Sequence, residues 1–190
     1  MSPSLPELVT KRLALRCWSE GDRDDFANMN ADPVVMRDLG GPLGRDESDR
    51  KLDRYAESFD RNGYGRWAID LLLDGSRREF LGYAGVMPVS GEHPLGLHNE
   101  IGWRLRQDAW GHGFASEAAG AALRDVFTRI GLTHVLSYTA SDNARSQAVM
   151  ERLGLRREPS LDFSANYGGT ELWHGLVWVA SPSTTHSNER

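Results

Sequence analysis

The sequence predicts a single α/β domain in which a mixed β-sheet is covered by helices. The chain has 190 residues, which is enough for one sizeable core and short for two. Strand-like patterns come first and an alternation of strand and helix follows, which is the order expected for a mixed sheet. No internal repeat divides the body of the chain. We therefore place one domain over residues 1–179 and expect the polar segment 180–190 to be a frayed end.

The N-terminal segment contains one expected strand and two expected helices. Leu13, Leu15 and Cys17 alternate with charged or small residues, which predicts a strand over residues 11–18 with one buried face. Two charge-rich segments with scattered apolar positions predict helices over residues 22–30 and 47–60. Pro33 separates them, because the residue before a proline avoids the helical conformation.

Three strands are expected next, over residues 66–73, 80–86 and 99–106. The sequence at residues 74–76 (DGS) predicts a turn that joins the first two. The segments 38–44 and 90–96 contain glycine and proline and are expected to be loops. They are not read as domain linkers, because neither separates two segments that could each form a core.

The C-terminal half contains the best-defined helix. A stripe of small and apolar residues at helical spacing predicts it, with Gly131 as its C-cap. The stripe consists of Ala115, Ala118, Ala119, Ala122, Leu123, Val126, Phe127 and Ile130. A strand, a helix and a closing strand are expected over residues 134–139, 143–153 and 171–179. Asn143 is the expected N-cap of the second helix and Gly154 its stop. The unit over residues 99–139 should be a right-handed parallel crossover.

Composition and charge exclude several classes of protein. The formal net charge of −5 at pH 7 argues against nucleic-acid binding through bulk charge. No apolar run reaches the roughly 18–20 residues needed to cross a bilayer, and the N-terminus does not resemble a secretory signal. Cys17 is the only cysteine, so neither an internal disulfide nor a cysteine metal cluster can form. We therefore expect a cytoplasmic protein with no membrane or nucleic-acid partner.

A glycine-containing loop between a strand and the long helix is the most informative segment. Gly111 and Gly113 allow a tight turn, and the first turn of the helix adds unpaired N–H groups and a positive dipole end. Such a loop suits a phosphate or pyrophosphate, and it is equally compatible with a tight turn that binds nothing. No lysine follows the second glycine, and Ser116 stands where a G-x-G-x-x-G motif needs its third glycine. The standard nucleoside-triphosphate and NAD loops are therefore both disfavoured.

Five short motifs occur in order along the chain. They are 10–16 (TKRLALR), 80–82 (FLG) with 100–105 (EIGWRL), 110–118 (WGHGFASEA), 143–146 (NARS) and 151–155 (ERLGL). Together they resemble the GNAT acetyltransferases, in the branch named after the ribosomal-protein N-acetyltransferases RimJ and RimL. Trp110 replaces the Arg or Gln of the general GNAT loop, and tryptophan is usual there in that branch. The resemblance extends from about Thr10 to Trp178.

The resemblance implies a GNAT (acyl-CoA N-acyltransferase) fold, with a mixed, mostly antiparallel twisted sheet and helices on both faces. It also implies acetyl-CoA as cosubstrate and no metal. The sheet of the family splays beside the strand over residues 99–106 and leaves a slot for the thioester. The residues expected to bind the cofactor are Trp103, Arg104 and Leu105 through their backbone, the pyrophosphate loop Gly111, His112, Gly113, Phe114, Ala115 and Ser116, and Asn143.

The implied reaction is direct transfer of the acetyl group to a primary amine. Glu100 is the candidate general base, and the alternative is a solvated strand-end carboxylate. The N–H of Leu105 or a neighbour is the candidate donor to the oxyanion. Ser146 either hydrogen-bonds the leaving sulfur or caps the start of its helix. Met150 occupies the position where other members of the superfamily carry a tyrosine acid.

The remaining conspicuous polar and aromatic residues are expected to have structural roles. Glu117 is expected to complement the helix dipole. His93 and His98 lack a third ligand at fixed spacing, so no metal site is expected. Trp18 and Trp173 could line an acceptor cleft, although core packing is favoured.

The sequence leaves more than one possibility for the acceptor, the oligomeric state and the function. The sequence does not decide whether the acceptor is a protein N-terminus or a small amine. It also does not decide whether the protein is a monomer or a homodimer. Acceptor contacts are expected from residues 38–66 and 91–98. Two other functions remain: a non-catalytic CoA-binding or sensor module, and a nucleotide- or phosphopeptide-binding protein that uses the glycine loop.

Overall fold

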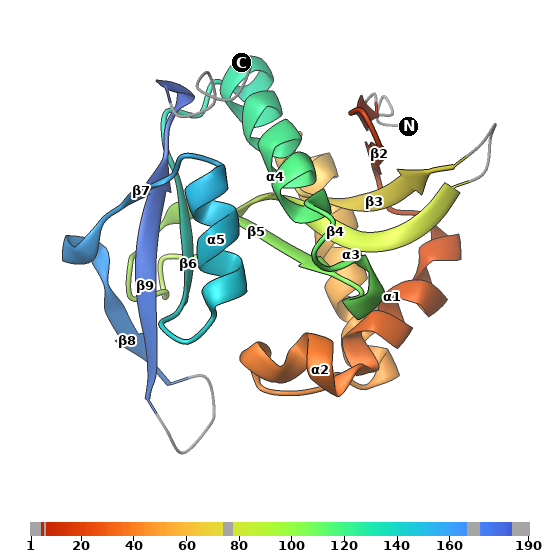
Figure 1. Cartoon of the computed structure of the whole chain (residues 1–190), viewed down its shortest axis with the longest axis horizontal. Helices are drawn as coiled ribbons and strands as arrows, with labels where there is room; N and C mark the ends of the chain where they lie inside the picture. Colours follow the sequence, from red (N-terminus) through yellow and green to blue (C-terminus); the bar gives the residue numbers. More distant parts are fainter. Residues whose placement is uncertain (1–4, 6, 74–77, 167–171, 184–190) are drawn as a thin grey trace.

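A single twisted sheet organises the protein. The computed structural model describes residues 5, 7–73, 78–166 and 172–183 (Figure 1). Within these residues the sheet has nine strands: eight follow the order β1-β2-β3-β4-β5-β6-β9-β7, and the ninth, β8, pairs with β9. The strands are β1 (Leu8–Val9), β2 (Leu13–Arg16), β3 (Arg66–Leu72), β4 (Arg78–Val89), β5 (His98–Leu105), β6 (Val135–Ala140), β7 (Arg156–Arg157), β8 (Phe163–Ala165) and β9 (Trp173–Ala180).

The strand directions confirm the predicted mixed, mostly antiparallel sheet. Every described pair is antiparallel except β5 with β6, which run parallel. A parallel neighbour requires a crossover, and the long helix between β5 and β6 supplies it. The predicted unit over residues 99–139 is therefore confirmed as a parallel strand–helix–strand crossover.

Helices cover both faces of the sheet (Figure 1). They are α1 (Arg23–Ala31), α2 (Pro33–Met36), α3 (Arg45–Asn62), α4 (Phe114–Asp125) and α5 (Ala144–Arg152), with short turns η1 (Glu20–Asp22), η2 (Arg37–Leu39), η3 (Gln107–Ala109), η4 (Val126–Ile130) and η5 (Pro159–Leu161). The small residues from Ala118 to Ala122 in α4 are buried, so this helix lies close to the sheet. None of the described helices is long and apolar enough to cross a membrane.

Two apolar clusters form the core, one on each face of the central strands. The larger contains Leu13, Trp67 and Ile101 with the buried face of α4. The smaller contains Phe26, Tyr55 and other residues of α1–α3 against β3 and β4. Alternating side chains of the strands feed the two clusters in turn, as the period of two predicts.

The structure differs from the sequence prediction mainly in short elements. The segment Asp32-Pro33, expected only to interrupt, starts α2: the Asp32 side chain accepts a hydrogen bond from Val34 N at 2.8 Å, and Pro33 occupies the first turn. The short strands β1, β7 and β8 were not predicted. The long helix is α-helical to Asp125 and then continues as the single π-helical turn η4. The turn predicted at residues 74–76 lies outside the described residues.

Candidate active site

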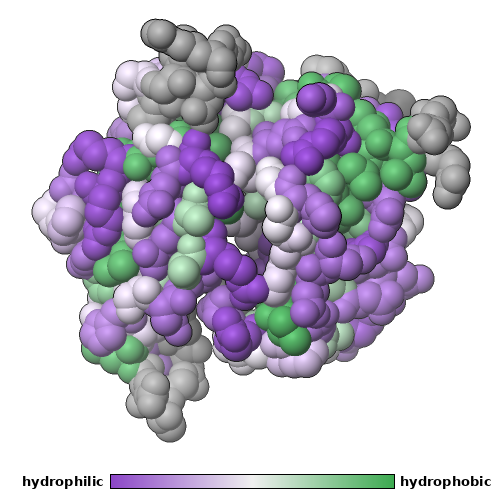
Figure 2. Space-filling model, in the orientation of Figure 1, coloured by the Kyte–Doolittle hydropathy of each residue, from purple (hydrophilic) through white to green (hydrophobic). Residues whose placement is uncertain are grey.

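The sheet opens between β5 and β6. The two strands are paired only at Glu100 and Leu136, and Ser137 Oγ donates to Ile101 O beside this point at 3.1 Å. From Gly102 to Leu105 the described part of β6 offers β5 no partner. We call this open edge of β5, with the facing part of β6 and α5, the split. The splay expected from the family resemblance is therefore present, and Figure 2 shows a hollow in the middle of this view of the molecule.

The strand geometry determines which backbone groups face the split. Arg106 N donates to Leu81 O at 2.9 Å, and in an antiparallel ladder such pairs recur at every second residue. The backbone groups of Arg104 are therefore directed to β4, opposite Tyr83. Those of Trp103 and Leu105 are directed to the split, where Leu105 O accepts a bond from Trp110 Nε1 at 2.9 Å. Trp103, Arg104 and Leu105 were expected to bind the pantetheine arm of the cofactor through their backbone. Trp103 and Leu105 direct their backbone groups into the split, and Arg104 does not.

The glycine loop adjoins one end of the split. Gly111 and Gly113 have φ values of 81° and 79°, a left-handed conformation that residues with a Cβ adopt at a cost. Gly113 is the N-cap of α4, so the free N–H groups of the first helical turn start here. A Cβ on Gly111 would meet no atom within 4 Å, so the backbone is open on this side.

Ser116 carries an unsatisfied hydroxyl at this helix end. Its Oγ is buried and has no hydrogen-bond partner among the described residues. Buried polar atoms are normally paired, so an orphaned one in a loop of exposed amides indicates a missing polar partner. Together with the two left-handed glycines and the open edge of β5, Ser116 fits an extended ligand that ends in phosphates.

An N-terminal clamp holds the glycine loop. Glu117 accepts hydrogen bonds from Thr10 Oγ1 at 2.6 Å, Arg12 N at 2.9 Å and Arg12 Nε at 2.7 Å. Arg12 also donates to His112 O at 2.9 Å and lies over the Phe114 ring. Burial raises the pKa of Glu117, but these hydrogen bonds outweigh it, and the net pKa is lowered. Glu117 thus anchors the turn between β1 and β2 to α4, a role that the sequence analysis did not assign.

Helix α5 forms the other side of the split. Asn143 Oδ1 accepts a hydrogen bond from Ser146 N at 3.1 Å, which confirms Asn143 as the N-cap. The hydroxyl of Ser146 takes no part in this cap and has no partner among the described residues. Arg145 stacks on the Trp110 ring, 3.9 Å from its centroid, and so links α5 to the glycine loop. Met150 is 1% exposed and belongs to the core.

Glu100 lies where the two parallel strands separate, and a buried cation holds it. Arg66 Nη2 lies 2.8 Å from Glu100 Oε2, and Arg66 Nη1 donates to Gly85 O. In the strand register Arg66 of β3 lies opposite Gly85 of β4, and Gly85 lies opposite Gly102 of β5. The guanidinium therefore passes over two glycine positions to reach the carboxylate. The side chain of Glu100 is 23% exposed. It is therefore a positioned, half-buried carboxylate rather than a solvated strand end.

An aromatic cluster lies beside the start of β5. His93 stacks on Tyr138 at 5.0 Å and meets His98 edge-on at 4.9 Å, while Phe163 packs against Tyr138 and Trp173. The described residues contain no group of three or more potential ligands for a metal ion. Trp173 belongs to this cluster near the split.

Trp18 lies away from the split. It packs on Phe26 and donates from Nε1 to Arg66 O at 2.5 Å, as expected of a core residue.

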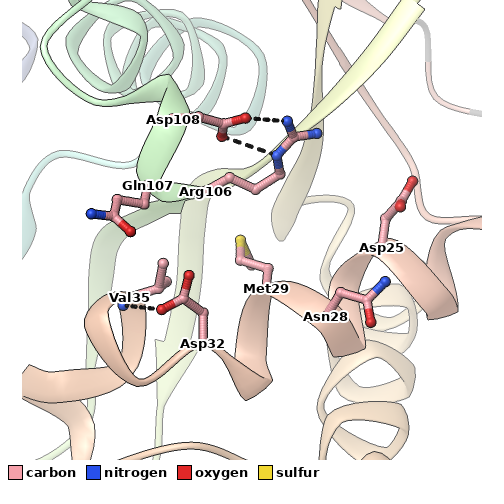
Figure 3. Close-up of a pocket in the computed structure, with 8 residues that line it drawn as sticks. All are labelled: Asp25, Asn28, Met29, Asp32, Val35, Arg106, Gln107 and Asp108. Carbon is pink, nitrogen blue, oxygen red and sulfur yellow. Dashed lines mark hydrogen bonds and ion pairs between the residues drawn. The ribbon is translucent and has the colours of Figure 1, made fainter.

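A separate open cavity of about 660 Å³ lies between α1, α2 and η3 (Figure 3). Its eight lining residues include none of the predicted site residues. Three of its charged groups are already engaged: Asp32 caps α2, and Asp108 binds the Arg106 guanidinium (Figure 3). The split is therefore the better candidate for the active site.

Comparisons with known proteins agree on one family. Residues 12–156 match the family model described as an acetyltransferase (GNAT) domain. FsC-acetyl coenzyme A-N(2)-transacetylase from Aspergillus fumigatus is 31% identical over 159 residues, which are 79% of this chain and 65% of that protein. The chain thus spans slightly less than two thirds of the length of that relative.

Two bacterial proteins match over most of both chains. The uncharacterized N-acetyltransferase YnaD of Bacillus subtilis is 37% identical over 80% of this chain and 83% of its own. The crystal structure of an acetyltransferase from Agrobacterium tumefaciens has a TM-score of 0.75 and 28% identity, covering 95% and 96% of the two chains.

Proposed function

Because the chain belongs to the GNAT acetyltransferase family, we propose that it transfers an acetyl group from acetyl-CoA to a primary amine by direct attack at the split. The observation that carries this proposal is the position of Glu100, which an ion pair holds at the one described register pair between β5 and β6. The glycine loop adjoins the same opening. The motifs favour the RimJ/RimL-like branch.

Acetyl-CoA supplies the activated thioester when it is bound. The backbone groups of Trp103 face the split and suit its pantetheine arm, whereas Leu105 O is already bound by Trp110 Nε1 and only the N–H of Leu105 remains available. The amides of residues 111–116 and the orphaned hydroxyl of Ser116 suit its pyrophosphate. Asn143 stands across the split at the start of α5.

Glu100 accepts the proton of the attacking amine in this proposal. Its Oε2 is bound by Arg66, so the carboxylate is fixed in direction, and Oε1 has no bond among the described residues. General bases contribute about 10²–10⁴-fold to rates. The N–H of Leu105 is the proposed donor to the carbonyl oxygen, because strand alternation directs it into the split.

Ser146 is the proposed donor to the leaving sulfur. Its hydroxyl has no partner among the described residues, and it lies one helical turn from the Asn143 cap. Met150 carries no acidic proton. Because a thiol of pKa about 8–9 can leave with little help at neutral pH, a serine hydroxyl suffices.

A CoA-binding module without turnover is the competing function, and the methionine at position 150 is the observation that favours it. Thiol release from acetyl-CoA with a panel of primary amines separates the two. We expect amine-dependent release from the wild type, strongly reduced release from Glu100→Gln, and normal release from the control Glu79→Gln, a carboxylate on β4 that pairs with Arg106. Tight CoA binding without release for any amine would support the module instead.

A further inference from the structure

We propose that the amine acceptor also carries an acidic group, a carboxylate or a phosphate, which the side chains of Lys51 and Arg104 bind next to the reacting amine. The inference rests on the proposed function and specifies its substrate class. It is carried by two half-buried cations that have no anionic partner in the described residues and that lie on the Glu100 face of the sheet.

The placement follows from the strand register. Glu100, Gly102 and Arg104 alternate along β5, so their side chains share one face of the sheet. Arg104 pairs with Tyr83 of β4, and its Nη1 lies 2.7 Å from Met36 Sδ in α2. Lys51 of α3 reaches the same place, with Nζ 5.7 Å from the centroid of the Tyr83 ring. Both cations thus stand on the α2–α3 side, beside the open edge of β5.

The phosphates of the cosubstrate do not account for these cations. The glycine loop leads into α4, which packs against the larger core cluster on the opposite face of the sheet. Lys51 and Arg104 instead adjoin the smaller cluster, through Tyr83 and Met36. An anion at this place would therefore come from the acceptor.

The charge balance leaves room for such an anion. Most described arginines form an ion pair, and Arg66 is paired with Glu100. Among the described lysines and arginines, Lys51 and Arg104 alone combine a half-buried side chain with no ion pair to a carboxylate. The group of Lys51, Arg66, Arg104 and Glu100 therefore contains three cations and one carboxylate. Buried charge without a counter-charge is unfavourable, so the group favours an anionic ligand.

The directions of two pKa shifts agree with this placement. Burial lowers the pKa of Lys51; Tyr83 opposes this shift, and the neighbouring arginines add to it, so that the net pKa is lowered. Burial raises the pKa of Tyr83, but Lys51, Arg104 and Arg66 outweigh it and lower that pKa to about 7. The cause of this lowering is the positive charge of the three neighbouring cations, which agrees with their placement around Tyr83. In such surroundings a cationic acceptor is repelled, whereas an amine that brings its own acid is attracted.

The test compares matched acceptors in matched variants. We would measure kcat/KM for ω-amino carboxylates of increasing chain length and for their carboxamides, and for aminoalkyl phosphates and the corresponding amino alcohols. The enzymes are the wild type, Lys51→Met, Arg104→Gln and the control Arg54→Gln, an exposed cation one turn along α3. Comparing each acid with its amide across variants cancels differences in amine basicity. Circular dichroism and melting temperature establish that each variant folds.

We expect Lys51→Met and Arg104→Gln to lower kcat/KM about 10–100-fold for the acid-bearing acceptors and less than about threefold for their neutral partners, with the acetyl-CoA KM unchanged. The carboxylate and phosphate series identify which acid is preferred. Equal losses for the acid and its neutral partner would overturn the inference, because the cations would then serve only Tyr83 and the fold.

Failure of the proposed function would look different. If CoA binds by calorimetry but no amine releases thiol, catalysis is contradicted. The melting temperature of the CoA-loaded protein with the same acids then tests the anion site. Stabilisation by an acid that Lys51→Met abolishes would uphold the site, and no stabilisation by any acid would overturn it.

Discussion

The guanidinium of Arg66 on β3 reaches across β4 to bind the carboxylate of Glu100 on β5, with Nη2 2.8 Å from Oε2. The path lies over Gly85 and Gly102, which pair across the two strands. A Cβ on Gly102 would lie 2.8–3.0 Å from three guanidinium atoms. The absence of a side chain at position 102 is therefore what lets the ion pair form at the split.

Gly102→Ala should displace Arg66 and release Glu100 from its position. We expect kcat to fall about 10–100-fold, since a misplacement of about 1 Å can cost 10²-fold, with little change in the acetyl-CoA KM. Steady-state kinetics measures both. Gly91→Ala is the control, because a Cβ there meets no atom within 4 Å. Normal kcat in Gly102→Ala would mean that the ion pair does not orient the base.

Gly113→Val should abolish CoA binding and leave most of the fold intact. A β-branched residue at φ 79° is strained and restricts approach to the loop amides. Gly131→Val is the matched control, because Gly131 has a φ of 81° at the opposite end of the same helical segment. Both variants should lose about 1–3 kcal/mol of stability, but calorimetry should find normal CoA affinity only in the control. Unchanged affinity in Gly113→Val would remove the loop from the cofactor site.

Ser146→Ala should lower kcat about tenfold or less and leave the melting temperature almost unchanged. The helix cap joins Asn143 Oδ1 to the backbone N–H of Ser146, which alanine retains. Asn143→Ala removes that cap and should cost about 1 kcal/mol of stability. Comparing kcat and melting temperature in the two variants separates chemistry from capping. A normal kcat in Ser146→Ala would show that Ser146 does not donate a hydrogen bond to the departing thiolate.

Glu117→Gln should destabilise the protein at neutral pH and much less in acid. The pKa of Glu117 is lowered in the folded state, against burial, by hydrogen bonds from Thr10 and Arg12. Its stabilisation is thus fully present above the unfolded value of about 4.3 and is lost as the pH falls through the lower folded pKa. Denaturant unfolding should show a difference of about 1–2 kcal/mol at pH 7 that shrinks below about pH 4. A difference independent of pH would contradict the assigned clamp.

Local patterns were sufficient to predict the long elements. The alternation of Leu13 and Leu15 predicted β2, and the small-residue stripe predicted α4 with its continuation η4. The expected single buried face of β2 was wrong, because Ala14 between the two leucines is buried as well. Asn143 and Gly131 marked helix ends in the same local way. Helix α2 was missed because four residues are too few for a period, although Asp32 and Pro33 are a typical helix start.

The contacts that build the site join residues far apart in the chain. Arg66 and Glu100 are separated by 34 residues, and Arg12 and Glu117 by 105. Pairing them requires the strand register, which the sequence does not give. The glycines at positions 85 and 102 were an available signal, because a glycine inside a strand often marks a close approach. The split itself depends on where two distant strands cease to pair, so no single segment encodes it.

The pH dependence of thiol release in Glu100→Gln tests the central claim most directly. With a reactive amine at saturating acetyl-CoA, we expect turnover to fall about 10²-fold at neutral pH and the loss to shrink as rising pH supplies free amine. The acetyl-CoA KM should change little. A pH–rate profile that keeps its height and its acidic limb in Glu100→Gln would contradict the account, because the carboxylate at the split would then take no proton from the amine.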